Sequence, residues 1–87
     1  MHELGIANSV IEAVREEMAR RPGARLKKVG LRIGEFAGIE DSSLRFCFDV
    51  LVRDTELRAA SLEIERSSRD ELDLSYLEVE EDEPDPH

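Results

Sequence analysis

The sequence predicts a single α+β domain of two layers, in which two helices pack on one face of a three-stranded mixed sheet. Two segments, residues 3–20 and 42–53, place apolar residues at the spacing of an amphipathic helix. Three others, residues 28–33, 61–66 and 71–80, alternate apolar and polar residues as half-buried strands do. The order helix, strand, helix, strand, strand favours two helices that cover one face of a sheet.

The first helix is predicted over residues 3–20. Its apolar stripe consists of Leu4, Ala7, Val10, Ile11, Val14 and Met18. Pro22 and Gly23 are expected to end the helix, since proline breaks helices and glycine favours turns. This boundary puts His2 and Glu3 at the helix N-terminus, where unpaired backbone N–H groups favour carboxylates. A carboxylate at Glu3 is therefore also explained without any metal.

The first strand is predicted over residues 28–33. Val29, Leu31 and Ile33 occupy alternate positions and are expected to face the core. Gly34 is expected to end the strand or to form a bulge.

The second helix is predicted over residues 42–53. The preceding run of residues 40–43, Glu-Asp-Ser-Ser, offers N-cap residues, and Asp41 is a candidate for the cap. Leu44, Cys47, Phe48 and Leu51 follow at helical spacing. Because Cys47 lies on this apolar stripe, we expect a buried, inert thiol rather than a metal ligand or a nucleophile.

The last two strands are predicted to form an antiparallel hairpin, because only the short polar run 67–70 separates them. Leu72, Leu74 and Tyr76 are expected to share one face of the second strand. The apolar pattern then changes phase at residues 76–77, which indicates a bulge or the end of the strand.

The domain is predicted to end at residue 80, with residues 81–87 as an acidic, disordered tail. Metal binding by His87 and the tail carboxylates is a weaker alternative. Residues 1–80 would then form the whole folded domain.

Charge and composition exclude several classes of partner. The 87 residues carry 21 acidic and 12 basic side chains, a net charge of −9, which opposes nucleic acids and anionic membranes. One cysteine rules out an internal disulfide or a CxxC pair. No run approaches the ~18 apolar residues of a membrane span, and no secretion signal precedes the first helix. The expected location is the cytoplasm.

No arrangement of residues predicts an enzyme. The isolated glycines do not form a phosphate-binding loop. Both histidines lie at the extremes of the chain, so neither a Ser-His-acid nor a Cys-His arrangement has an interior base. We expect a binding protein.

The first residues, Met1-His2-Glu3, bring together three nitrogen donors: the terminal amine, the His2 amide and the His2 imidazole. Planar sets of nitrogen and oxygen donors suit Ni(II) or Cu(II), whereas zinc prefers a tetrahedral set, often of thiolates. The terminus therefore favours nickel or copper over zinc. The alternative is that His2 is an ordinary exposed residue near a chain end.

Four segments of the chain are informative in combination: MHEL at the start of the first helix, VGLRIGE at 29–35, LRFCFDVL at 44–51 and LEIE at 62–65. Together they resemble the HypA/HybF family of nickel metallochaperones in [NiFe]-hydrogenase maturation. The segment LEVE at 77–80 is similar to the last strand of that family. The resemblance is continuous over about residues 1–66.

The resemblance implies that the chain binds Ni(II) and delivers it. Family members bind nickel through the N-terminal histidine and nearby backbone nitrogens, then pass it on with a nickel-handling GTPase to the hydrogenase precursor, with urease maturation as a further destination. Here the metal-binding residues would be Met1, His2 and Glu3. An acidic residue just before the second helix can join or orient the site in this family, and Glu40 occupies that place.

One module of the family is missing from this chain. Members normally carry a zinc module with two CxxC pairs before the last strand, but only residues 67–70 stand there. We therefore expect no structural zinc, and natural loss and engineered deletion of the module both stay open. Two alternatives to nickel delivery also stay open: a metal-independent interaction or adaptor protein, and copper binding, since Cu(II) outranks Ni(II) at a given site. Only the resemblance selects nickel.

Overall fold

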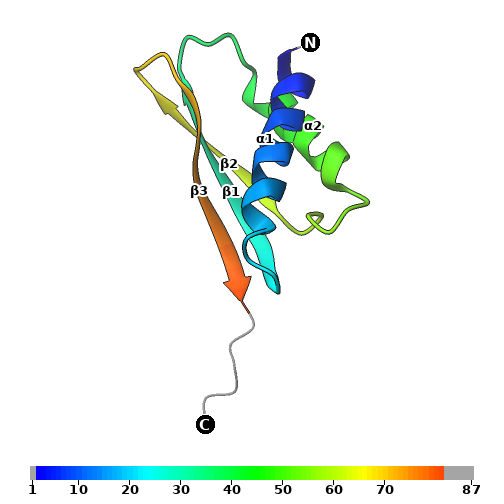
Figure 1. Ribbon diagram of the computed structural model, residues 1–87. Coiled ribbons are helices and arrows are strands. Elements are labelled where there is room, and N and C mark those ends of the chain that lie inside the picture. Colours follow the sequence, from blue (N-terminus) through cyan, green and yellow to red (C-terminus); the bar gives the residue numbers. More distant parts are fainter. Residues whose placement is uncertain (1, 82–87) are drawn as a thin grey trace.

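Two helices and three strands follow one another in the predicted order (Figure 1). The computed structural model describes residues 2–81, apart from the side chain of His2; Met1 and residues 82–87 lie outside the described part. The elements are α1 (His2–Met18), β1 (Ala24–Gly34), α2 (Asp41–Val52), β2 (Ser61–Ser67) and β3 (Leu72–Glu81). The predicted α+β class, with two helices and a three-stranded mixed sheet, is confirmed.

The sheet has the order β2-β1-β3, so the predicted hairpin between the last two strands is wrong. Strand β1 lies in the middle, parallel to β2 and antiparallel to β3. The chain leaves β2 beside Gly34 and enters β3 beside Ile33, at the same end of β1. The short connection therefore crosses the end of β1 instead of turning back along β2.

Gly34 makes this crossing possible. A Cβ atom at Gly34 would lie 2.3 Å from the backbone oxygen of Arg69, so only glycine lets the connection pass so close. The crossing is held by two backbone bonds, from Gly34 N–H to the Glu71 oxygen and from Glu35 N–H to the Ser67 oxygen, each 2.8 Å long. Gly34 is also the last residue of β1, as predicted.

A side-chain bond reinforces the same connection. The Ser67 hydroxyl donates to the Glu71 carboxylate and holds the pKa of that carboxyl below its usual value. The bond closes residues 67–71 into a compact turn beside the end of β1.

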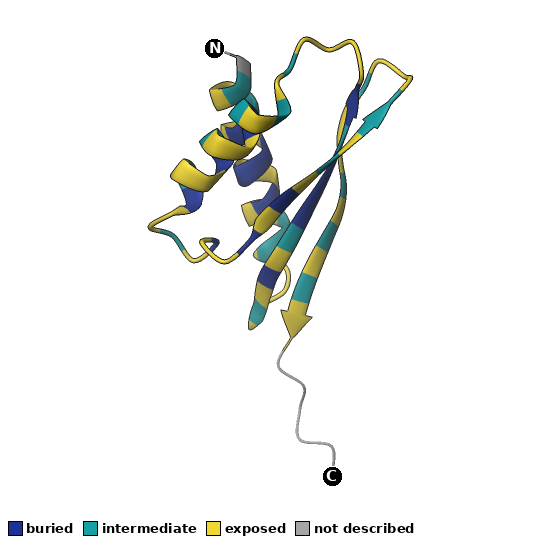
Figure 2. Cartoon of the chain, turned by 180° about the vertical axis from the view of Figure 1, so that it is seen from behind, coloured by how far each residue is buried: buried dark blue, intermediate teal, exposed yellow. Residues whose placement is uncertain are grey.

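The core lies between the helices and the sheet, where the buried residues of both layers meet (Figure 2). Val29, Leu31 and Ile33 of β1 are fully buried, as their alternation predicts. The predicted helical stripes supply most of the other core residues, which include Ala7, Val10, Ile11, Val14, Leu44 and Phe48. Cys47 is only half-buried, but it packs against this core.

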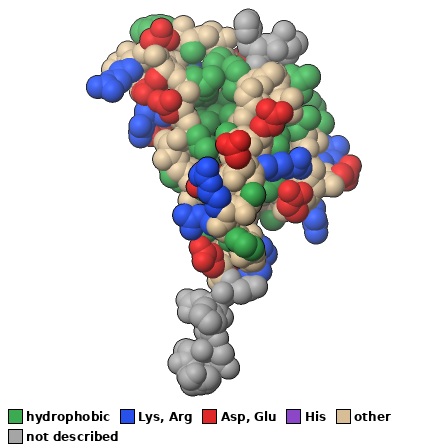
Figure 3. Space-filling model, in the orientation of Figure 1, with side chains coloured by type: hydrophobic (Ala, Val, Ile, Leu, Met, Phe, Trp, Pro, Cys, Tyr) green, Lys and Arg blue, Asp and Glu red, His purple; other side chains and the backbone are tan. Residues whose placement is uncertain are grey.

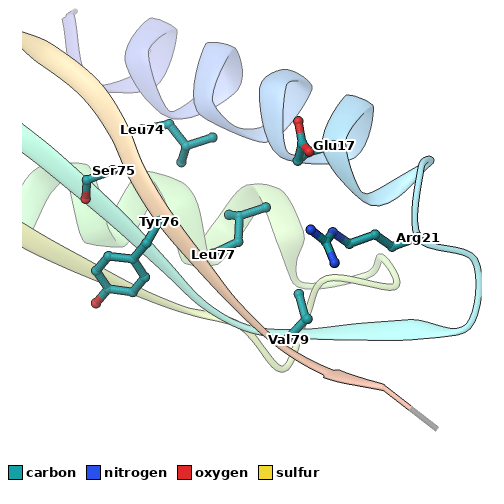
Figure 4. Close-up of a pocket in the computed structure, with 7 residues that line it drawn as sticks. All are labelled: Glu17, Arg21, Leu74, Ser75, Tyr76, Leu77 and Val79. Carbon is teal, nitrogen blue, oxygen red and sulfur yellow. The ribbon is translucent and has the colours of Figure 1, made fainter. Parts of the chain in front are cut away.

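A bulge in β3 reverses the predicted orientation of Tyr76. Tyr76 pairs with Gly30 and Leu74 pairs with Leu31, which leaves Ser75 as an extra residue on β3. The predicted irregularity is therefore present, but before Tyr76 rather than after it. A Cβ atom at Gly30 would lie 2.1 Å from Cε2 of Tyr76, so the ring covers Gly30 on the face away from the helices (Figure 4).

The helix-facing side of β3 is only partly covered. Leu72 and Leu74 remain 47% and 36% exposed. Beside Leu74 a hollow opens between the end of α1 and β3, with Glu17 and Arg21 on its helical side (Figure 4). Apolar side chains gather on the surface along this seam (Figure 3). Strand β3 continues through Glu81, whose carboxylate forms an ion pair with Arg21.

Neither helix in residues 2–81 has the length and apolar character that would let it cross a membrane.

Two phenylalanines of α2 provide a test of this core. Phe48 is 0% exposed, so Phe48→Ala should lower the free energy of unfolding by about 3–5 kcal/mol, the usual cost of a cavity of that size. Phe46 is 66% exposed, and Phe46→Ala should change stability by no more than about 0.5 kcal/mol. Urea denaturation followed by circular dichroism measures both, and equal losses would contradict the described packing.

Candidate metal centre

The four predicted metal-site residues are described to different extents. Met1 lies outside the described residues, and of His2 only the backbone is described, as the first residue of α1. Glu3 and Glu40 are described in full. Chelation by Met1 and the His2 imidazole therefore stays a prediction.

The start of α1 has one consequence for the His2 amide. The first N–H groups of a helix have no carbonyl partner within the helix. Because α1 begins at His2, hydrogen bonding inside the helix makes no use of this amide. A metal ion could replace its proton without breaking the helical ladder.

Glu3 and Glu40 come together although 37 positions separate them in the sequence. The Glu40 backbone N–H donates to Oε2 of Glu3 over 3.2 Å. Glu3 lies in the first turn of α1, and Glu40 is the residue directly before α2. The N-termini of the two helices therefore meet beside the predicted metal-binding terminus (Figure 1).

Glu40 takes the N-cap position that the sequence suggested for Asp41. Its backbone is extended, with φ −91° and ψ 119°, and its side chain makes no capping bond to the helix backbone. One carboxylate oxygen instead accepts the hydroxyl of Ser42. Asp41 is the first residue of α2 and binds Arg66, so its predicted capping role is wrong.

Arg66 is a residue that the sequence reading did not single out. It stands near the end of β2 and donates from Nη1 to the Gly34 oxygen over 2.8 Å and from Nη2 to the Ile39 oxygen. It also binds Oδ1 of Asp41 through Nε and Nη2, at 3.1 and 2.6 Å. Its strand pattern carries no signal of this role, because the three partners lie within or directly beside the loop 35–40, far from Arg66 in the sequence.

The carboxylates near the terminus do not form a metal site by themselves. Among the side chains described in residues 3–81, no group of three or more His, Cys, Asp and Glu residues could hold a metal ion. A role of Glu3 and Glu40 at a metal site therefore stays a prediction, like that of Met1 and His2.

The sequence matches one family model over most of its length. The model is described as "Hydrogenase/urease nickel incorporation, metallochaperone, hypA", and it matches residues 1–70. The chain belongs to the HypA family. The resemblance seen in the N-terminal and central segments is thereby confirmed. Most of β3, Leu72–Glu81, lies beyond the matched residues.

Similar hydrogenase maturation factors come from several organisms. The hydrogenase maturation factor HypA of Methanopyrus kandleri is 45% identical over 65 residues, 75% of this chain and 46% of the relative. The HypA factor of Beijerinckia indica is 41% identical over 64 residues, 74% of this chain and 57% of the relative. The hydrogenase maturation factor HybF of Klebsiella pneumoniae is 38% identical over 65 residues. The chain spans about half the length of the curated relatives that it matches.

A solved structure of the HypA family has the same fold. The solution structure of the Ni metallochaperone HypA from Helicobacter pylori aligns with a TM-score of 0.67 and 16% identity. The alignment covers 85% of this chain and 70% of that protein.

The contact between Glu3 and Glu40 predicts a local effect of Glu3→Ala. Without the carboxylate, the Glu40 amide loses its acceptor, so its hydrogen exchange should become at least several-fold faster. The unfolding free energy should fall by about 0.3–1 kcal/mol, because a carboxylate in the first turn of a helix is lost. Amide exchange by NMR measures the first effect and urea denaturation the second.

The matched control is Glu12→Ala, in the exposed middle of α1. It removes a carboxylate from the same helix without touching α2. If Glu12→Ala accelerated exchange of the Glu40 amide as much as Glu3→Ala, the specific role of the Glu3 contact would be refuted.

Proposed function

We propose that the chain is a Ni(II)-binding metallochaperone that delivers nickel for [NiFe]-hydrogenase or urease maturation. The Met1 amine, the His2 amide and the His2 imidazole would be the principal donors. Glu3 and Glu40 would orient the terminus or provide a further contact. Nickel is then the cargo of the protein, and no enzymatic step is required.

The start of α1 at His2 is the observation that carries this proposal. It leaves the His2 amide outside the helical hydrogen bonds, directly before Glu3. An amine, a deprotonated amide and an imidazole make a planar donor set, which Ni(II) accepts and zinc does not prefer. The Glu3 contact with Glu40 holds the adjoining turn beside the start of α2.

Family membership supports nickel rather than copper as the cargo. The family description names nickel incorporation for hydrogenase and urease, and the similar relatives are named hydrogenase maturation factors. Delivery would involve a nickel-handling maturation GTPase and the hydrogenase precursor in the cytoplasm. Because the chain spans about half of its relatives, whole-protein delivery is the part of the proposal that most needs a direct test.

The rival function is a metal-independent adaptor that keeps this fold. A short peptide added before Met1 separates the two, because it turns the donor amine into an amide. Nickel binding and delivery should then be lost, whereas docking to a partner by an adaptor should be unaffected.

A nickel titration tests the terminal site directly. Wild-type protein should bind one equivalent of Ni(II) with the absorption spectrum of planar nickel, and His2→Ala should weaken binding by at least about a hundredfold, or about 2.7 kcal/mol. His87→Ala is the matched control, because it removes the other histidine of the chain and should leave the affinity unchanged. Binding that depended on His87 instead would assign the metal to the acidic C-terminus and refute the proposed site.

The same donors predict the direction of the pH dependence. Bound nickel requires a neutral imidazole and deprotonated amine and amide nitrogens, so protons compete with the metal. Affinity should therefore fall steeply as the pH drops through the ordinary imidazole pKa of ~6.5. Isothermal titrations at several pH values measure this slope, and a flat profile would exclude these donors.

A further inference from the structure

Residues 35–40 connect β1 to α2 and carry Glu40 to the start of α1. The segment has no regular secondary structure apart from turns, and it contains Gly38 at φ +74°. Something outside the segment must therefore hold its conformation, because a loop of this kind has access to many backbone states.

Arg66 closes this loop at both ends. Its guanidinium binds the carbonyl of Gly34, directly before the loop, and the carbonyl of Ile39, directly before Glu40. The same group binds the carboxylate of Asp41, directly after Glu40. Glu40 thus stands between two residues that are tied to one side chain. A planar guanidinium with several fixed donors suits this arrangement, and a lysine ammonium cannot reproduce it.

The contacts of Arg66 differ from the exposed ion pairs on the sheet. The Arg66 side chain is 28% exposed, and it binds two backbone carbonyls as well as a carboxylate. Arg32, on the neighbouring strand β1, makes a single 3.3 Å contact with Glu65 at side-chain exposures of 43% and 64%. Exposed ion pairs such as the one between Arg32 and Glu65 contribute little to stability.

We propose that Arg66 is a positioning residue for the metal-binding terminus, an inference that rests on the proposed function. Arg66 holds residues 35–40 so that the Glu40 amide meets the Glu3 carboxylate. Glu3, which directly follows the residues that would supply the donors, is thereby fixed before the metal arrives. Arg66 itself touches no metal, and it acts through Glu40 and Glu3.

The arrangement also connects the terminus to the chain that follows β2. Ser67, next to Arg66, accepts the N–H of Glu35, and Glu71 accepts the N–H of Gly34. The connection between β2 and β3 and the loop that carries Glu40 therefore share one set of hydrogen bonds. A change in residues 67–71 would reach Glu3 through Arg66.

The test compares Arg66→Met, Arg66→Lys and Arg32→Met in the full chain. Arg66→Met keeps the length of the side chain but loses every donor. It should accelerate amide exchange at Glu40 and weaken Ni(II) binding by roughly tenfold, equivalent to about 1.4 kcal/mol. Arg66→Lys should have intermediate effects on exchange and on nickel affinity, because it keeps the positive charge but loses the planar set of donors. Arg32→Met, which removes an exposed pair on the same sheet, should change neither quantity.

Circular dichroism and thermal unfolding of each variant separate positioning from general loss of fold. If Arg66→Met is unfolded, Asp41→Asn provides the same test, because it weakens one arm of the contact and leaves both carbonyl bonds in place. Asp41→Asn should then accelerate Glu40 exchange and lower nickel affinity by a few-fold, on the order of a single weakened charged hydrogen bond.

Folded Arg66→Met with unchanged Glu40 exchange, or with unchanged nickel affinity, would overturn the proposal. Failure of the proposed function looks different. In that case wild-type protein itself shows no binding that depends on His2, and the role of Arg66 in metal binding falls with it. The exchange rates, measured without metal, then decide separately whether Arg66 holds the loop.

Discussion

The burial of one strand organises this molecule. Val29, Leu31 and Ile33 of β1 are all but inaccessible to solvent, and β1 supplies the hydrogen-bonding partner of both other strands. Removing such residues from water contributes the main favourable free energy of a small domain. Because β1 takes the centre of the sheet, β2 and β3 lie on opposite sides of it. The chain from β1 to β2 passes through α2, and the chain from β2 to β3 crosses the end of β1.

The end of β1 is where the fold and the candidate site meet. Gly34 ends the strand, lets the connection from β2 to β3 cross, and begins the loop that leads to Glu40. Arg66, near the end of β2, binds the carbonyl oxygens of Gly34 and Ile39 and so holds the loop that ends in Glu40. Glu40 then meets Glu3 in the first turn of α1. The position of the Glu3 carboxylate thus depends on contacts that start in the sheet, not only on the local sequence of α1.

Local patterns predicted the elements of this fold better than their arrangement. The periodicity of apolar residues found both helices and all three strands, because burial on one face leaves a mark in the sequence. It does not predict the strand order, because a short polar segment such as 67–70 can either turn back along β2 or cross the end of β1. The bulge at Ser75 was located only approximately, and Tyr76 was therefore assigned to the wrong face. The sequence predicts Glu3 and Glu40 as site residues, but their contact and the hydrogen bonds of Arg66 depend on three-dimensional geometry between distant segments.

The position of the proposed donors has a consequence for how a metal cargo can be held and released. A structural metal binds in the interior of a small domain, and its binding energy becomes folding energy. Here the core is a continuous apolar cluster of the helices and the sheet, and the proposed donors belong to His2, the first residue of α1, and to Met1 before it in the sequence. Loading and unloading of nickel at this end would leave that core intact. Under the proposed function, the fold would keep Glu3 and Glu40 in contact between one ion and the next, while the terminus exchanged its metal with a partner.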